Sequence, residues 1–202
     1  ALLVAFMSTG FGVLVGALAG FYRGWVDAVL MRSTDLALTV PQYAAAGALA
    51  YQFGGRNNGW IYLAFILAAF YWQPIARVVR GVFLSLREKE YVEAARALGA
   101  GNGRIMFRHL LPNAVGPIIV NATLVVALAI LAETALSYIG LGIQPPDTSL
   151  GQLVAQGQQA ATTRPWLFYF PGLFIIVIVL TINFVGDGLR DAFDPTQTRV
   201  RA

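Results

Sequence analysis

Residues that build metal, redox and nucleotide sites are rare or missing in this sequence. It contains no cysteine and one histidine, His109. Without cysteine, the chain forms no disulfide, thiolate zinc site or iron–sulfur cluster, and one histidine is too few for a multi-histidine metal site. The sequence also lacks a G-x-x-x-x-G-K-[ST] loop, the usual cradle for nucleotide phosphates. We therefore expect no metal, no cofactor and no catalytic residue in this chain.

Charged residues are also scarce. They make up 12% of the chain, whereas about 25% is typical of a soluble domain. Hydrophobic residues make up 57%, and the mean hydropathy is +0.65. This composition predicts a chain embedded in a lipid bilayer. The net charge of +4 does not indicate nucleic acid as a partner, because the basic residues lie beside apolar segments.

Five apolar segments are long enough to cross a hydrocarbon core about 30 Å thick at 1.5 Å per residue. The sequence therefore predicts an all-α polytopic membrane protein, with residues 1–202 as one domain. The predicted spans are residues 2–21, 36–53, 60–82, 114–131 and 166–185.

Glycines and prolines mark special positions in these spans. Gly12, Gly16 and Gly20 share one face of the first span, and this spacing lets another helix approach closely. Glycine is also common in membrane helices, so the repeat alone does not distinguish close helix packing from ordinary composition. Four spans contain proline, which removes a backbone donor and favours a kink: Pro41, Pro74, Pro117 and Pro171.

Charges near two span ends are expected at the membrane surface. Residues 22–35 are short and amphipathic and are expected to form a cytoplasmic turn leading into a helix that starts before the membrane. For this segment a solvated connection with an interfacial Trp25 is favoured over packing or a lipid anchor at the inner face. Arg77 and Arg80, near the end of the third span, are expected to extend to the interface.

Residues 88–113, EKEYVEAARALGAGNGRIMFRHLLPN, form the most polar long segment. They predict two short helices joined by a hinge. Spacing of i, i+3, i+4 and i+7 places one apolar stripe on the first helix, with Glu93 and Arg96 off it: Tyr91, Ala94, Ala95 and Leu98. The glycines at 99 and 101 end that helix, and Pro112 marks the start of the next span.

The lysines and arginines predict the orientation, because they are enriched in cytoplasmic loops. If residues 88–113 are cytoplasmic, all of the 14 basic residues except Arg56 and Arg164 fall on the same side. Five spans then place Ala1 outside and Ala202 inside.

Several phrases resemble one known family. YVEAARALG at 91–99 and RHLLPN at 108–113 are similar to the EAA loop in membrane subunits of ABC importers, in the dipeptide, oligopeptide and nickel branch. YRGWVDA at 22–28 and GLGIQPP at 140–146 resemble the same branch, as does the closing segment 186–195. The resemblance implies a type I importer transmembrane domain and, specifically, a C-type subunit. Such permeases carry an additional N-terminal span, so we expect either a fragment or a short member.

The resemblance implies that residues 88–113 contain a coupling helix that docks in a groove of a cytoplasmic ATPase. On the residues alone, an amphipathic helix lying on lipid is an equal alternative; with the family phrases we favour docking. Glu93 is expected to fix the register, Gly99 to act as the hinge, and His109 to hold the junction with the next span. The implied coupling residues are Tyr91, Glu93, Ala94, Ala95, Arg96, Leu98, Gly99, His109 and Pro112.

Four polar residues in or beside the spans are candidates for the translocation pathway: Gln73, Asn121, Glu133 and Asn183. The two asparagines and the glutamine equally fit hydrogen bonds between helices, which are more common. Glu133 is expected just past the fourth span. At that position we favour a structural cap or pairing of the Glu133 carboxylate over a role in an outer gate or a contact with substrate.

These observations together predict a permease subunit of a bacterial inner-membrane importer for peptides or a related solute such as nickel. The resemblance implies a second homologous permease, one or two ATPase subunits that bind ATP and Mg²⁺, and an extracytoplasmic binding protein. An ion-coupled secondary transporter is the alternative, but it would not need the EAA phrase. A membrane enzyme is disfavoured, because the chain has no thiol and no evident Ser–His pair inside the membrane.

Overall fold

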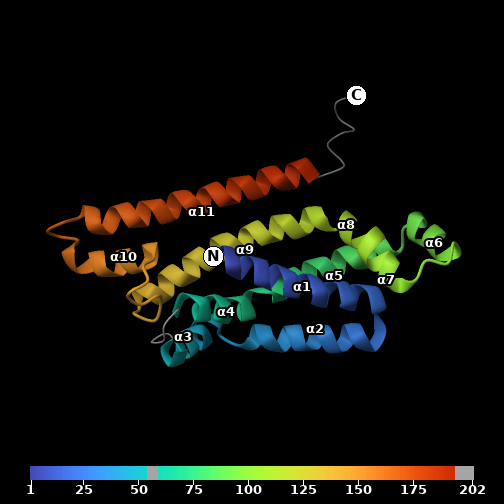
Figure 1. Ribbon diagram of the computed structural model, residues 1–202, viewed down its shortest axis with the longest axis horizontal. Coiled ribbons are helices and arrows are strands. Elements are labelled where there is room, and N and C mark those ends of the chain that lie inside the picture. Colours follow the sequence, from blue (N-terminus) through green and yellow to red (C-terminus); the bar gives the residue numbers. More distant parts are fainter. Residues whose placement is uncertain (54–58, 194–202) are drawn as a thin grey trace.

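The computed structural model describes residues 1–53 and 59–193, and those residues form helices and no strand. This confirms the all-α prediction (Figure 1). A π-helical segment, Ile105–Leu110, separates α7 from α8, and a 3₁₀ turn follows α10. The helices are α1 Leu2–Tyr22, α2 Gly24–Thr39, α3 Gln42–Phe53, α4 Gly59–Tyr71, α5 Gln73–Arg87, α6 Glu90–Ala97, α7 Asn102–Arg104, α8 Leu111–Asn113, α9 Val115–Tyr138, α10 Leu150–Gly157 and α11 Trp166–Phe193.

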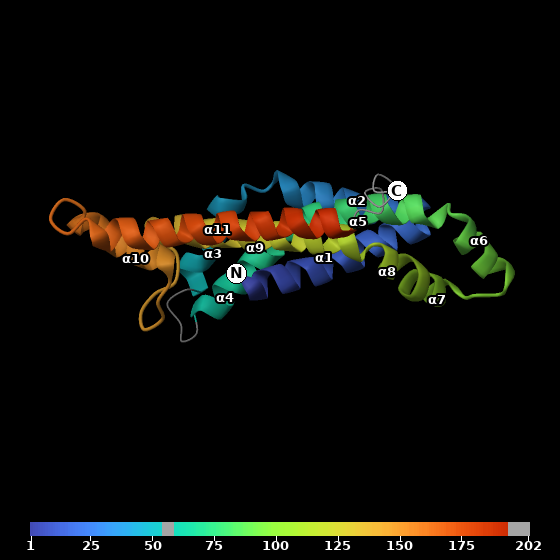
Figure 2. The same cartoon turned by 90° about the horizontal axis from the view of Figure 1, so that it is seen from above.

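The long helices form an elongated bundle with two different ends. Figures 1 and 2 show α6 and α7 projecting beyond the bundle at one end, while α3 and α10 lie toward the other. The turn between α1 and α2 and the last residues of α11 lie toward the α6 end (Figure 1). The α6 and α7 part of residues 88–113 thus lies at one tip of the bundle.

Close packing of α1 on α5 forms the centre of the bundle. A Cβ atom at Gly12 would lie 2.7 Å from the carbonyl oxygen of Trp72, and one at Gly20 would lie 2.7 Å from Cβ of Phe83. At Gly16, an added Cβ would overlap the carbonyl oxygen of Ala76. The three glycines therefore do what their spacing predicts: they let two helix backbones approach closely.

The predicted second span is not a single helix. Residues 36–39 complete α2, and α3 begins after a break at Val40 and Pro41. Val40 is extended, as expected for a residue before proline, and α3 has only 12 residues.

Length and composition therefore support fewer than the five predicted spans in the described ranges. Three helices, α1, α9 and α11, are long and apolar enough to cross a membrane. The pair α4 and α5 makes a fourth if counted as one span, bent by 43°. This pair matches the third predicted span, and Pro74 lies at the start of α5, where the missing backbone donor costs least.

The last two predicted spans are present and longer than expected. The fourth continues to Tyr138 and the fifth to Phe193. Pro117 lies in the first turn of α9, so of the four prolines in the predicted spans, all within the described residues, only Pro171 lies in a helix interior. Apart from Ile175 and Gly186, α11 is not buried in this chain. Arg56, Arg199 and Arg201, used in the orientation argument, and the family phrase at 194–195 lie outside the described residues.

Candidate functional site

The helix α6 is attached to the bundle by a different face from the predicted one. Val92 is fully buried and Ala95 is 9% exposed. Val92 joins the same core cluster as Ile105 and Leu110 of the π-helical segment. The predicted stripe is therefore wrong in part: Ala95 faces inward with Val92, which was not assigned to the stripe.

The remaining apolar residues of α6 face away from the protein. Tyr91 is 41% exposed and Leu98 is 88% exposed, and Ala94 between them is exposed as well. Glu93 and Arg96 are exposed beside them. Partial burial raises the pKa of Tyr91 above its ordinary value. The free face thus combines apolar side chains with two exposed acids, Glu90 and Glu93, and one exposed base, Arg96.

A glycine turn ends α6 as the sequence predicts. Gly99 has a φ of 80°, a conformation that glycine adopts without strain. The amide of Ala100 donates to the carbonyl of Ala95 at 3.0 Å, and that of Gly99 donates to Arg96 at 2.9 Å. This pair of bonds is a Schellman motif, which satisfies the last carbonyls of the helix.

The second half of the 88–113 segment is anchored in the core. Ile105 and Leu110 are fully buried, whereas Arg104 and Arg108 are exposed. The carbonyl of His109 accepts a hydrogen bond from Asn113 Nδ2 at 2.6 Å. Two short helical segments joined by a glycine turn are confirmed, whereas the hinge role of Gly99 stays a prediction. The junction role of His109 stays a prediction.

Three ion pairs join α2 to the segment 77–88, and the sequence analysis missed them. Arg23 pairs with Glu88 at 2.5 Å. The guanidinium of Arg80 donates two hydrogen bonds to Asp27, at 2.5 and 2.6 Å. Farther along α2, the guanidinium of Arg77 donates a hydrogen bond to Asp35 at 2.6 Å.

These pairs correct two expectations. A turn leading into a helix is confirmed for residues 22–35, since α2 begins at Gly24. This helix also packs on α5, however, so packing was wrongly disfavoured and the segment is more than a solvated connection. Arg77 and Arg80 pair with carboxylates of α2 and do not extend alone to the interface. The missed signal was charge complementarity: Asp27 and Asp35 are two helical turns apart in a chain with few acids.

Arg87, at the end of α5, contacts the end of α1. Its guanidinium donates a short hydrogen bond to the carbonyl of Phe21 and lies 5.9 Å from the centre of the Phe21 ring. Together with the Arg23–Glu88 pair, this contact holds in place the end of α5, where the 88–113 segment begins.

The four pathway candidates are not brought together. Gln73 is fully buried, and its Nε2 donates to Ala69 within the bent pair at 3.4 Å. Its Oε1 has no hydrogen-bond partner within the described ranges. Asn121 donates to Pro117 of its own helix at 2.9 Å, and Asn183 is half-buried. The bonds of Gln73 and Asn121 are local, so neither links distant helices.

Glu133 lies inside α9 and not past its end, which corrects the predicted position. Its carboxylate accepts hydrogen bonds from Ser137 at 2.6 Å and Ser149 at 2.7 Å. Ser149 also accepts from the amide of Gln152 at 3.0 Å and so caps α10. The acid therefore fastens α10 to α9, in agreement with the structural pairing that the sequence favoured.

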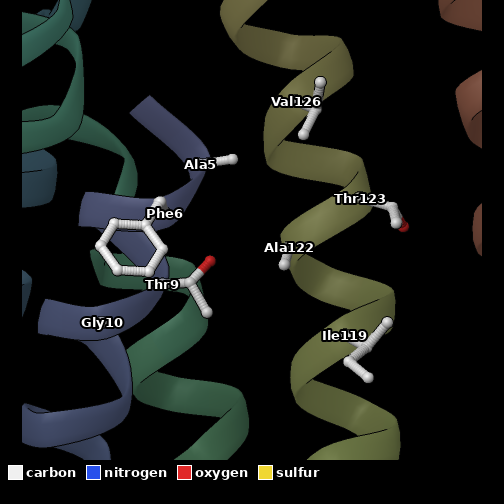
Figure 3. A pocket seen from close by; sticks show the side chains of 8 residues that line it. All are labelled: Ala5, Phe6, Thr9, Gly10, Ile119, Ala122, Thr123 and Val126. Carbon is white, nitrogen blue, oxygen red and sulfur yellow. The ribbon is translucent and has the colours of Figure 1, made fainter. Parts of the chain in front are cut away.

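A hollow of about 350 Å³ between α1 and α9 has almost entirely apolar walls (Figure 3). Its lining includes Phe6 and Thr9 from α1 and Ala122 and Val126 from α9. No charged side chain lines it, so it does not suit a polar solute.

Comparison with known proteins decides the family. Residues 12–199 match the family described as binding-protein-dependent transport system inner membrane component. The chain belongs to this family.

Similar members of this transport family are named as peptide permeases. The oligopeptide transport system permease protein OppC of Mycobacterium tuberculosis is 44% identical over 198 residues, which cover 98% of this chain and 68% of that protein. The dipeptide transport system permease protein DppC of Alkalihalophilus pseudofirmus is 41% identical over 186 residues, covering 92% and 60%. This chain thus spans about three fifths to two thirds of their lengths.

The fold of this family member also matches a solved transporter. A chain of the MetNI methionine ABC transporter, in inward-facing conformations, superposes with a TM-score of 0.72. The match covers 95% of this chain and 89% of that chain at 20% identity. This likeness confirms the type I importer fold.

Proposed function

We propose that this chain is a permease subunit of an ATP-driven importer for peptides, coupled to its ATPase through residues 88–113. The observation that carries the proposal is α6. This helix projects from the bundle and ends in a glycine turn. Its side chains Tyr91, Ala94 and Leu98 are exposed. The chain lacks a P-loop, so the ATP that drives it must bind to another subunit. The names of the relatives support peptides as the solute.

The two faces of α6 fit two different contacts, one with its own chain and one with the ATPase. Val92 and Ala95 hold the helix to its own chain. Tyr91, Ala94 and Leu98 enter a groove of the ATPase, where the small alanine permits close approach. Glu93, beside them, supplies the polar contact that fixes the register, and Arg96 contributes at the rim of the groove.

Movement of α6 reaches the spans through two connections. One passes through Glu88 and Arg87, which are bonded to Arg23 and to the carbonyl of Phe21. The other passes through Ile105 and Leu110, which are fully buried ahead of α9. When ATP binding closes the ATPases, α6 moves with them, and the bent α4–α5 span rocks so that the pathway faces alternately outward and inward.

The orientation follows from the same coupling. Residues 88–113 and the C-terminus lie in the cytoplasm of a bacterium, and the α10 end lies at the outer face of its inner membrane. A second, homologous permease completes the pathway, and one or two ATPase subunits bind ATP and Mg²⁺. An extracytoplasmic binding protein delivers the solute, as the description of the family suggests.

Reconstitution tests this function directly. The complete transporter is placed in liposomes, and peptide uptake is measured with and without ATP and with and without the ATPase subunit. We expect uptake only when both are present. Uptake driven by a proton or sodium gradient, without the ATPase, would instead identify an ion-coupled transporter.

A further inference from the structure

Arg104, Phe107 and Arg108 form one exposed face of the segment that leads into α9. Their spacing of i, i+3 and i+4 places them on the same side of the helical chain. The two arginines are exposed, and Phe107 is 63% exposed. Ile105 and Met106, which lie between them in the sequence, are buried. This 104–108 face therefore presents an aromatic ring beside two guanidinium groups.

The positive charge of the 104–108 face is not neutralised within the described part of the chain. The arginines of the three ion pairs each face a carboxylate, whereas no ion pair among the described residues includes Arg104 or Arg108. No aspartate or glutamate occurs from residue 94 to residue 132. Both guanidinium groups are thus available to an anionic partner.

The opposite side of the same segment is held against the bundle. Leu110 is fully buried in the core cluster that includes Phe83 of α5, and the π-helical segment packs on α5. Only residues 109–114 separate Arg108 from α9, a helix long and apolar enough to cross a membrane. Figure 2 shows α6 as the outermost element at this end, with α7 between it and α8. The 104–108 face therefore adjoins a candidate span, and α6 lies beyond it.

We propose that the 104–108 face binds the headgroup of an anionic phospholipid at the membrane surface. The family to which the chain belongs is an inner membrane component, so phospholipid surrounds the bundle. Guanidinium groups bind phosphate through paired, charge-assisted hydrogen bonds, and their aliphatic stems lie along apolar surface. An aromatic ring beside them fits the boundary between headgroups and acyl chains. The inference depends neither on peptide transport nor on the docking of α6.

An acidic surface of the ATPase is the other partner that this charge would attract. The structure favours lipid, because the 104–108 face adjoins a candidate span and is held against α5. The exposed side chains of the outermost helix, α6, include Tyr91 and Leu98 instead. The two partners also differ in a measurable way, because only lipid binding makes the face sensitive to the headgroups around it.

Fluorescence quenching in nanodiscs tests the proposal in the assembled transporter. The chain has no native cysteine, and partner cysteines are removed. A fluorophore on Phe107→Cys takes the place of the ring, and one on Leu98→Cys, which is 88% exposed on α6, is the matched control. Bromine atoms on acyl chains quench a nearby fluorophore. Brominated phosphatidylglycerol should quench the label at position 107 more strongly than equally brominated phosphatidylcholine, whereas the two lipids should act equally at position 98.

Arginine substitutions measure the contribution of charge. Arg104→Gln and Arg108→Gln should each raise the fraction of phosphatidylglycerol needed for half-maximal quenching about fivefold, the attraction of one basic residue to an anionic membrane surface. Lysine at either position should keep most of the preference, because it keeps the charge. Arg190→Gln removes an exposed arginine from the last turn of α11 and should leave the fraction unchanged. Added salt should weaken the preference by screening exposed charges.

The opposite results would overturn the proposal. Equal quenching at position 107 by both lipids would show contact with the bilayer without recognition of an anionic headgroup. No quenching by either lipid, with protection from an aqueous quencher when the ATPase is added, would assign the face to the ATPase. A loss in Arg190→Gln as large as in the other variants would indicate attraction by net charge alone. Shielding of position 98 by the ATPase tests the proposed function separately and changes none of these outcomes.

Discussion

At the residue scale, α6 separates the side chains that hold it from those that it offers to a partner. Val92 and Ala95 are buried, while Glu93 and Leu98 are exposed. The first pair holds the helix to its own chain, and the second pair is accessible for the proposed docking. Substitutions on the two faces should therefore have different consequences.

Replacement of Glu93 by alanine should weaken ATPase binding about tenfold, the effect of one charge-assisted hydrogen bond. Membrane insertion should be unchanged, because Glu93 is exposed. Copurification of the ATPase with the permease measures the effect. Asp191→Ala, which removes an exposed carboxylate from the last turn of α11, is the control. If the Glu93 variant retained the ATPase at full yield, Glu93 would have no part in docking.

Breaking the Asp27–Arg80 pair should destabilise the bundle. Asp27→Asn should lower the free energy of unfolding by about 1–2 kcal/mol, less than for a fully buried pair because Arg80 is 34% exposed. Thermal unfolding of the purified protein in detergent measures the loss. The exchange Asp27→Arg with Arg80→Asp should recover most of it. An exchange variant no more stable than Asp27→Asn would argue against direct pairing.

The sequence predicted the position of the coupling segment better than its contacts. The turn at Gly99 follows from local glycine chemistry, which a sequence displays directly. The burial of Val92 depends on Ile105 and Leu110, and the pairing of Asp27 depends on a helix 53 residues away. Such contacts are set by tertiary packing, so neither periodicity nor a motif reveals them.

At the element scale, the packing of α1 on α5 should be sensitive to any added side chain. Gly16→Ala places a Cβ against the carbonyl of Ala76 and should cost about 1–3 kcal/mol of stability, as overpacking does. Gly10→Ala on the same helix meets nothing within 4 Å and should be neutral or slightly stabilising. Thermal unfolding of both variants makes the comparison. Equal stabilities would contradict the close approach of the two helices.

Hydropathy predicted the apolar helices but misplaced the boundaries of two of them. The 36–53 segment is apolar enough to suggest one span, yet Pro41 and the extended Val40 divide it between α2 and α3. Conversely, α9 continues through Glu133 because two serines bond its carboxylate. Hydropathy averages over such local bonds and therefore misplaces boundaries.

At the scale of the whole molecule, the bundle has two different ends, and the proposed coupling segment lies at one of them. The α6 end carries the 88–113 segment, braced by Arg23–Glu88 and by Arg87 on Phe21. The half-exposed Asp35–Arg77 pair joins α2 to α5 farther from that end. At the other end, where Figure 1 shows α10, the carboxylate of Glu133 links this helix to α9. A force applied to α6 can thus reach α5 and α9 without passing through the exposed face of α11.

Crosslinking of Leu98→Cys in the complete transporter tests the central claim, that α6 docks on a cytoplasmic ATPase. The chain has no other cysteine, and Leu98 is 88% exposed on the free face of α6. With a short thiol crosslinker and single cysteines introduced along the ATPase surface, we expect a permease–ATPase product whose yield changes when ATP binds. Labelling of position 98 only from outside the cell, or no product with any ATPase cysteine, would contradict the account.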